Sequence, residues 1–155
     1  MQITYLNYFL ASIMAYLGLL VGLILTKLAP EEQKPGKKYF ILLKKILFFL
    51  ILASFLFFYK IDFILSAILL IFIIILMLNK KMNLSKSHLI YFIFGLIFYF
   101  SYFSKMLDLF IVESILTFLY GVPTASLILK KKNYYDVFVK NLWFFVPVVL
   151  LYFIF

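Results

Sequence analysis

The sequence predicts an all-α, polytopic integral membrane protein, a single transmembrane domain of about six helices arranged as three hairpins. Hydrophobic residues make up 67% of its 155 residues and charged residues only 14%, whereas soluble domains have about 25% charged and about half apolar residues. Several apolar runs reach the ~20 residues needed to cross ~30 Å of hydrocarbon. The runs do not alternate between polar and apolar residues, which excludes a transmembrane β-barrel.

The polar composition excludes several classes of protein. All 15 basic residues are lysines, and the formal net charge is +9. The absence of arginine disfavours bidentate recognition of phosphate. Because the lysines flank apolar runs, their charge indicates topology-setting residues and not nucleic-acid binding. The chain has no cysteine and a single histidine, so neither a metal nor another cofactor is expected. No P-loop, paired carboxylates or catalytic triad is present, and no catalytic residue is assigned.

The first two spans are separated by the longest polar stretch of the chain, residues 26–49, which holds six lysines. Pro30, Pro35 and Gly36 interrupt helices and predict a loop over residues 26–38. The apolar run after Lys45 is too short to cross a bilayer by itself. The second span is therefore expected to begin before the Lys44–Lys45 pair, whose ammonium groups would extend to the interface.

The remaining spans follow from short polar breaks. One helix over residues 39–78 would be ~60 Å long, about twice the bilayer core, so a turn is predicted at residues 59–62. A second short turn is predicted at residues 104–108. Asp62 and Asp108 each begin a span just after the lysine of the turn and are expected to cap the next helices. The predicted spans cover residues 5–25, 39–59, 61–78, 89–103, 107–129 and 134–155.

The distribution of lysines predicts the orientation in a cell membrane. With six spans, thirteen of the 15 lysines fall on one side and only Lys60 and Lys105 on the other. The positive-inside rule then places the loops 26–38, 79–88 and 130–133 in the cytoplasm and both termini outside. A five-span arrangement would break this segregation.

Small residues predict a packing surface on the first span. Ala11, Ala15, Gly18 and Gly22 are four, three and four residues apart, so they share one helix face. Small residues let a neighbouring backbone approach closely. The neighbour is expected to be another helix of the same chain, or a second copy in a homo-oligomer.

Glu113 is the acidic residue placed well inside a span, and it predicts a substrate or proton pathway together with Gly121 and Pro123, which can kink a membrane helix. The alternative is a structural carboxyl that contributes only to packing. Because a carboxylate facing lipid would gain no partner, Glu113 is expected to face the bundle interior. Its expected neighbours are Ser66, Ser101, Tyr102 or Lys105.

Lys44, Lys45, Lys140 and Asn141 predict a basic pocket for an anionic lipid head group, because such pockets form between spans near the membrane surface. The alternative is that these residues only set topology. Residues 39–49 and 135–145 share Tyr, Lys and two Phe positions in register. This similarity indicates either a repeated hairpin or chance in a chain rich in phenylalanine.

The sequence therefore favours a small transporter or flippase-like protein, or the membrane subunit of a transport complex. One alternative is a membrane enzyme that binds lipid phosphates, although the chain is not clearly an enzyme. The other is a structural or assembly subunit. The expected partners are membrane lipids and either another membrane protein or further copies of the chain, without nucleic acid.

Overall fold

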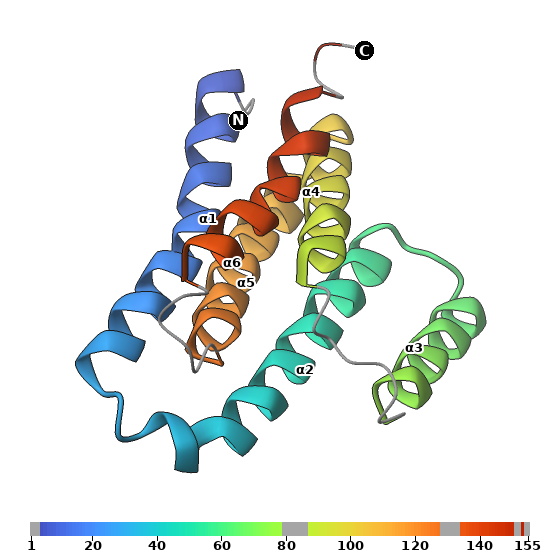
Figure 1. Ribbon diagram of the computed structural model, residues 1–155. Coiled ribbons are helices and arrows are strands. Elements are labelled where there is room, and N and C mark those ends of the chain that lie inside the picture. Colours follow the sequence, from blue (N-terminus) through green and yellow to red (C-terminus); the bar gives the residue numbers. More distant parts are fainter. Residues whose placement is uncertain (1–3, 79–86, 128–133, 151–152, 154–155) are drawn as a thin grey trace.

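The computed structural model describes residues 4–78, 87–127, 134–150 and 153. The prediction of an all-α fold is confirmed over this part of the chain (Figure 1). The described helices are α1 (Tyr5–Leu28), α2 (Gln33–Phe58), α3 (Phe63–Leu78), α4 (Ser87–Phe103), α5 (Leu107–Ser126) and α6 (Tyr134–Asn141). A 3₁₀ turn (Leu142–Phe144) and a π-helical turn (Val146–Leu150) follow α6.

Three of the described helices, α1, α2 and α5, are long and apolar enough to span a membrane. With 16 and 17 residues, α3 and α4 are ~24–26 Å long, somewhat less than the ~30 Å hydrocarbon core. The apolar segment Phe138–Val149 is shorter still. Length and composition thus support three spans, and the full count of six stays a prediction.

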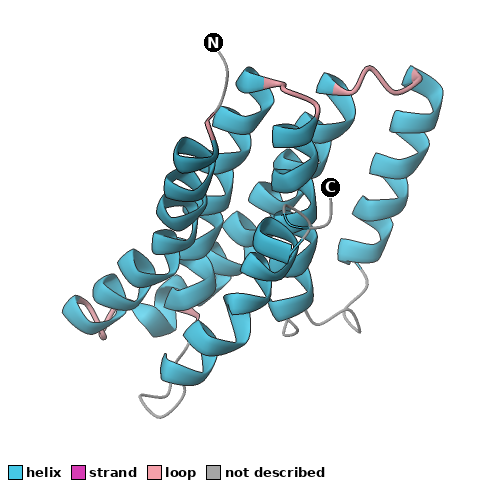
Figure 2. Ribbon diagram, turned by 90° about the horizontal axis from the view of Figure 1, so that it is seen from above, coloured by secondary structure: helices cyan, strands magenta, loops and turns pink. Residues whose placement is uncertain are grey.

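The helix α5 lies at the centre of the bundle and packs against α1, α2 and α4 (Figures 1 and 2). It runs parallel to α1, because Tyr8 lies beside Phe110 and Gly18 beside Phe118. The main contacts of α5 are thus with helices far away in sequence. The predicted arrangement as three hairpins of consecutive helices did not include this contact, in which small residues let α1 and α5 approach each other closely.

The contact between α1 and α5 is a backbone-to-backbone approach. A Cβ atom built on Gly18 would overlap the carbonyl of Phe118, whose carbon would lie 2.7 Å away. A Cβ atom on Gly121 would lie 2.6 Å from the carbonyl carbon of Gly18. Gly22 and Ala15 are also buried on this face, whereas Ala11 is only partly buried. The residues predicted as a packing surface therefore lie toward the bundle interior.

The start of α2 differs from the prediction. The helix begins at Gln33, before Pro35 and Gly36, and not near Tyr39. Proline in the first helical turn loses no intrahelical hydrogen bond, because the amides there have no acceptor within the helix. Gln33 also donates from Nε2 to the carbonyl of Thr26 at 2.8 Å. This bond satisfies an acceptor at the end of α1. The loop is shorter than predicted, because α1 continues to Leu28 and α2 already begins at Gln33.

The turns after α2 and α4 have the same construction. Lys60 and Lys105 have φ values of 50° and 56°, the left-handed conformation in which helices often end. In both turns the residue after the lysine donates a backbone hydrogen bond to a carbonyl near the end of the preceding helix. Ile61 N–H bonds to Leu56 O, and Met106 N–H bonds to Ser101 O. The hydroxyl groups of Tyr59 and Ser104 lie 2.6 Å apart. The two turns are therefore neighbours at one end of the bundle.

The two aspartates near these turns have different roles. Asp62 accepts hydrogen bonds from the amides of Ile64 and Leu65 at 2.9 and 3.2 Å, so it caps α3 as predicted. Asp108 lies within the first turn of α5, and Met106 occupies the capping position without a side-chain bond. The prediction of Asp108 as a cap is wrong, although a negative charge there still suits the positive end of the helix.

The C-terminal segment is less regular than the sequence predicts. The helical geometry changes at Leu142 and again at Val146, the residue before Pro147. Gly95 of α4 accommodates this segment, since a Cβ atom there would lie 2.6 Å from Pro147 Cγ. The regular 26-residue α2 has no counterpart here, so the sequence similarity between residues 39–49 and 135–145 does not extend to similar helices.

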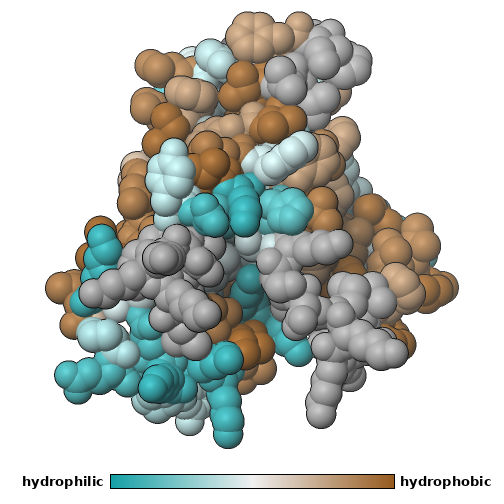
Figure 3. Space-filling model, viewed as in Figure 1, coloured by the Kyte–Doolittle hydropathy of each residue, from teal (hydrophilic) through white to brown (hydrophobic). Residues whose placement is uncertain are grey.

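Hydrophilic side chains gather at the end of the bundle where α1 is followed by α2 (Figure 3). This end holds Lys27, Lys34, Lys37 and Lys38, and the opposite end holds the turns with Lys60 and Lys105. The start of α1 and the end of the described C-terminal segment lie at that opposite end (Figure 1). The segments 79–86 and 130–133 lie outside the described residues.

Candidate functional site

Glu113 lies on the second turn of α5 and is buried, with 1% of its surface exposed. It is buried because α5 is a central helix, with most of its faces covered by α1, α2 and α4. The expectation that Glu113 faces the interior is met. The partner differs from the expected ones, since the carboxyl meets Ser54 of α2.

The hydroxyl of Ser54 lies between two acceptors. Its oxygen is 2.7 Å from Glu113 Oε1 and 2.9 Å from the carbonyl oxygen of Ile51. Serine has a single hydroxyl proton, so it can donate to only one of them. A carboxyl that carries a proton can donate to Ser54, which then donates to Ile51. The arrangement therefore accommodates Glu113 with or without its proton, using different hydrogen bonds in the two cases.

The second carboxylate oxygen, Glu113 Oε2, is buried and has no hydrogen-bond partner among the described residues. A buried polar atom without a partner costs roughly 1–3 kcal/mol. Such an atom is a place where a water molecule or a proton can bind with a gain in free energy. Glu113 is thus held on one side by Ser54 and open to an additional partner on the other.

Polar residues continue along the same face of α5. Thr117, Tyr120 and Thr124 follow Glu113 at intervals of four, three and four residues, and all three are buried. The Thr124 hydroxyl donates to the carbonyl of Tyr120 at 2.8 Å. Glu113 and Tyr120 are separated by ~10 Å along the helix. This row of side chains, here called the α5 polar face, was not recognised from the sequence.

Lys44 of α2 meets the α5 polar face. Its ammonium nitrogen lies 5.5 Å from the centre of the Tyr120 ring, within the range of a cation–π interaction. Only 5% of Lys44 is exposed. On α2, Lys44 and Ser54 are ~15 Å apart. Since both contact α5, the interface between α2 and α5 has a polar residue pair near each end.

The other residues predicted to bind an anionic head group do not share this environment. Lys45 is half-buried. Lys140 is exposed and forms an ion pair with Asp136 at 3.8 Å, one turn away on α6. Asn141 is fully buried, and neither its amide nitrogen nor its oxygen has a partner among the described residues. The four residues therefore lie at different depths, and their role in lipid binding stays a prediction.

Gly121 and Pro123 were expected to mark a kink or an unwound segment of α5. The helix continues through both residues to Ser126, so α5 is not unwound there. Pro123 lacks the amide that would bond to the carbonyl four residues earlier, and Gly121 makes the close contact with α1 described above. Gly121 thus lies at a contact between helices.

Two buried tyrosines add further polar atoms between α4 and α5. The ring centres of Tyr91 and Tyr120 are 5.9 Å apart. Their hydroxyl groups have no partner among the described residues. Together with Glu113 Oε2 and the amide of Asn141, they are polar atoms that internal water molecules would satisfy. No group of three His, Cys, Asp or Glu residues that could hold a metal ion occurs in the described part of the chain.

Some of these residues could have been identified from the sequence. Ser54 is the one polar residue between Lys45 and Tyr59, and a lone hydroxyl in an apolar span often bonds to another helix. The helical spacing of Glu113, Thr117 and Tyr120 was also visible. Their pairing with α2 depends on which helix covers that face, which the sequence does not state.

Comparison of the chain with protein-family models, curated proteins and solved structures found no match.

Proposed function

We propose that this chain is a small multi-pass membrane protein that moves protons, alone or coupled to another substrate, along the interface between α2 and α5. Glu113 is the residue that binds and releases the proton. The observation that supports this role is the environment of its carboxyl group, which is buried, bonded to Ser54 through Oε1 and without a described partner at Oε2. Ionisable residues inside membrane spans frequently belong to such pathways.

The α5 polar face supports a route from Glu113 toward the lysine-rich end of the bundle. Thr117, Tyr120 and Thr124 continue the row from Glu113, and Lys44 meets it at Tyr120. Hydroxyl groups both donate and accept hydrogen bonds, so with intervening water they can pass a proton. Lys44 places a positive charge near that end of the route, where it can regulate proton entry.

The proposed arrangement in the membrane has six spans, with the lysine-rich end in the cytoplasm and both termini outside. The distribution of lysines supports this orientation, since Lys60 and Lys105 occupy the opposite end from Lys27, Lys34 and Lys37. In this arrangement Glu113 lies in the outer half of α5, and Lys44 lies toward the cytoplasm.

Proton flux into liposomes tests the proposal. Purified protein is reconstituted into vesicles that contain a pH-sensitive dye, and a potassium gradient with valinomycin sets the membrane potential. We expect wild-type vesicles to acidify faster than protein-free vesicles. Glu113→Gln, which keeps the shape of the side chain but cannot ionise, should reduce the rate to the protein-free level.

A matched control is Glu32→Gln, because Glu32 is an exposed acid at the start of α2. This variant should retain the wild-type rate. Wild-type flux in the Glu113→Gln variant, or wild-type vesicles that acidify no faster than protein-free ones, would refute the proposal for the isolated chain.

The arrangement gives less support to a membrane enzyme that acts on lipid phosphates. Lys44 is buried beside Tyr120, and Lys140 pairs with Asp136 on the surface. A purely structural subunit is supported mainly by the contact between α1 and α5, which holds the chain itself together.

A further inference from the structure

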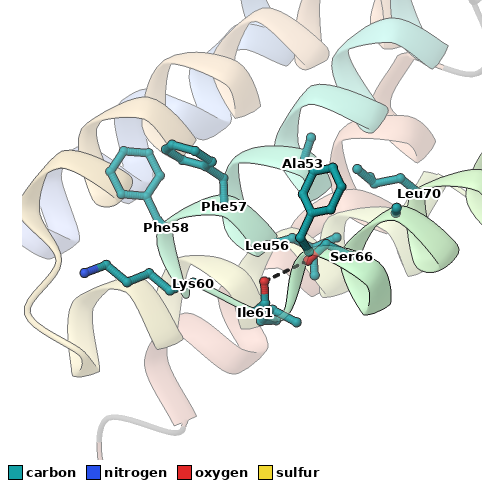
Figure 4. A pocket seen from close by; sticks show the side chains of 10 residues that line it. Ala53, Leu56, Phe57, Phe58, Lys60, Ile61, Ser66 and Leu70 are labelled. Atoms are coloured by element: carbon teal, nitrogen blue, oxygen red, sulfur yellow. Dashed lines mark hydrogen bonds between the residues drawn. The ribbon is translucent and has the colours of Figure 1, made fainter.

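A groove of about 720 Å³ lies between α2 and α3, at the end of the bundle with the Lys60 turn (Figure 4). One wall is the last part of α2, including Ala53 and Leu56, and the other is the first part of α3, including Ala67 and Leu70. Lys60 extends at one end of the groove (Figure 4). The groove is thus apolar along its length and has a cation at one end.

The groove exists because α3 stands at the edge of the bundle. Its main contacts are with α2 (Figure 2). The side chains of Ile64, Ile68 and Ile71 are all more than half exposed. In a bilayer these side chains contact acyl chains, which surround an apolar helix at high concentration. The space between α2 and α3 is therefore directly accessible to lipid.

The dimensions of the groove favour an acyl chain over a helix from another protein. Its walls extend from Ala53 to Ile61 and from Ile61 to Leu70, or ~12–14 Å along each helix. This length matches one leaflet, which is ~15 Å of the ~30 Å core. A helix ~10 Å across occupies ~420 Å³ per turn, so the groove would hold fewer than two turns. A membrane-spanning partner needs a contact surface along the whole bilayer.

The charge at the end of the groove suits a phosphate group. Lys60 is exposed, and the contact between Tyr59 and Ser104 places its turn next to the turn that contains Lys105. The neighbouring acid, Asp62, directs its carboxylate to the amides at the start of α3. Lysines close to a membrane surface attract anionic lipids.

We propose that this groove binds one acyl chain of an anionic phospholipid from the leaflet on the Lys60 side, with the lipid phosphate beside Lys60. The site is distinct from the residues that support the proposed proton route, because neither Glu113 nor Lys44 lines it. The bound chain fills the space beside α3 and holds this helix against α2.

Native mass spectrometry tests the site in protein mixed with phosphatidylglycerol or phosphatidylcholine that have the same acyl chains. We expect wild-type protein to retain one phosphatidylglycerol, bound about fivefold more tightly than phosphatidylcholine, the factor that corresponds to ~1 kcal/mol for one lysine at the surface. Lys60→Gln should abolish this preference. Ala67→Phe places a ring in the groove and should abolish retention of the lipid itself.

The matched controls are Lys38→Gln, an exposed lysine at the other end of the bundle, and Ile71→Phe, an exposed position of α3 outside the groove. Both should behave as wild type. Circular dichroism and size-exclusion chromatography establish that each variant remains folded. The proposal is overturned if folded Ala67→Phe protein retains the lipid, if Lys60→Gln keeps the preference, or if wild-type protein fills the groove by dimerising without lipid.

Discussion

The hydroxyl oxygen of Ser54 on α2 lies 2.7 Å from carboxyl oxygen Oε1 of Glu113 on α5. This hydrogen bond joins two apolar helices through residues that are 59 positions apart in the sequence. Glu113 thus has a partner at Oε1, whereas its other carboxyl oxygen, Oε2, has no hydrogen-bond partner among the described residues. The pair therefore combines a contact between helices with an unfilled position for a hydrogen-bonding partner.

The first prediction concerns the stability of this pair. Glu113→Leu removes a buried polar group, while Ser54 keeps its bond to the Ile51 carbonyl. Because no remaining polar atom then loses its only partner, we expect unchanged or slightly higher thermal stability in detergent. A purely structural role for Glu113 predicts a loss instead. In a double-mutant cycle of Ser54→Ala and Glu113→Leu, we expect a coupling of about 1 kcal/mol.

The second prediction concerns the glycine contact between α1 and α5. Gly18→Ala should destabilise the protein by about 1–3 kcal/mol, because its Cβ would overlap the Phe118 backbone. Gly36→Ala is the control, since a Cβ there would meet only the Phe40 ring at 3.0 Å. The control should be neutral or stabilising by up to ~1 kcal/mol. Equal thermal unfolding of both variants would contradict the close approach of the two helices.

The third prediction concerns the left-handed lysines. Lys60→Gly and Lys105→Gly should each stabilise the protein by about 1 kcal/mol, because glycine adopts positive φ values without the steric cost of a Cβ. Lys45→Gly, within the regular part of α2, should destabilise by about 1 kcal/mol. Thermal unfolding in detergent measures all three. If glycine destabilises at position 60 as much as at position 45, the turn does not adopt the described conformation.

The fourth prediction concerns orientation in the membrane. The protein has no natural cysteine, so single cysteines report their side of the membrane without interference. Glu31→Cys should react with a membrane-impermeant maleimide only after the cells are opened, and Lys105→Cys should react in intact cells. Both positions are exposed. Reaction of both cysteines from the same side would refute the orientation based on the lysine distribution.

Hydrophobic composition was sufficient to predict the helical class and most helix positions. The turn after α2 and the capping by Asp62 could also be predicted, because both depend on local residues and on helix length. The start of α2 was misplaced, since proline was treated as a helix breaker although it is tolerated in the first turn. Local signals were thus reliable where their position within the helix was considered.

The arrangement of helices was harder to predict. All apolar faces in this chain have similar composition, so hydrophobicity does not indicate which helices become neighbours. The glycines of α1 indicated a close contact, but not that α5 would provide it. The same uncertainty affected Glu113, whose interior position was expected, whereas its neighbour Ser54 depends on the packing of α2 against α5.

The pairing of Gly18 with Phe118 has a consequence for synthesis of the protein, because these residues are 100 positions apart in the chain. At a synthesis rate of ~5–20 residues per second, α1 is in the membrane for roughly 5–20 s before α5 has been synthesised. During this interval its glycine face is available to other helices. Chaperone contacts with nascent chains that end before α5 should therefore concentrate on α1 and disappear once α5 has been inserted.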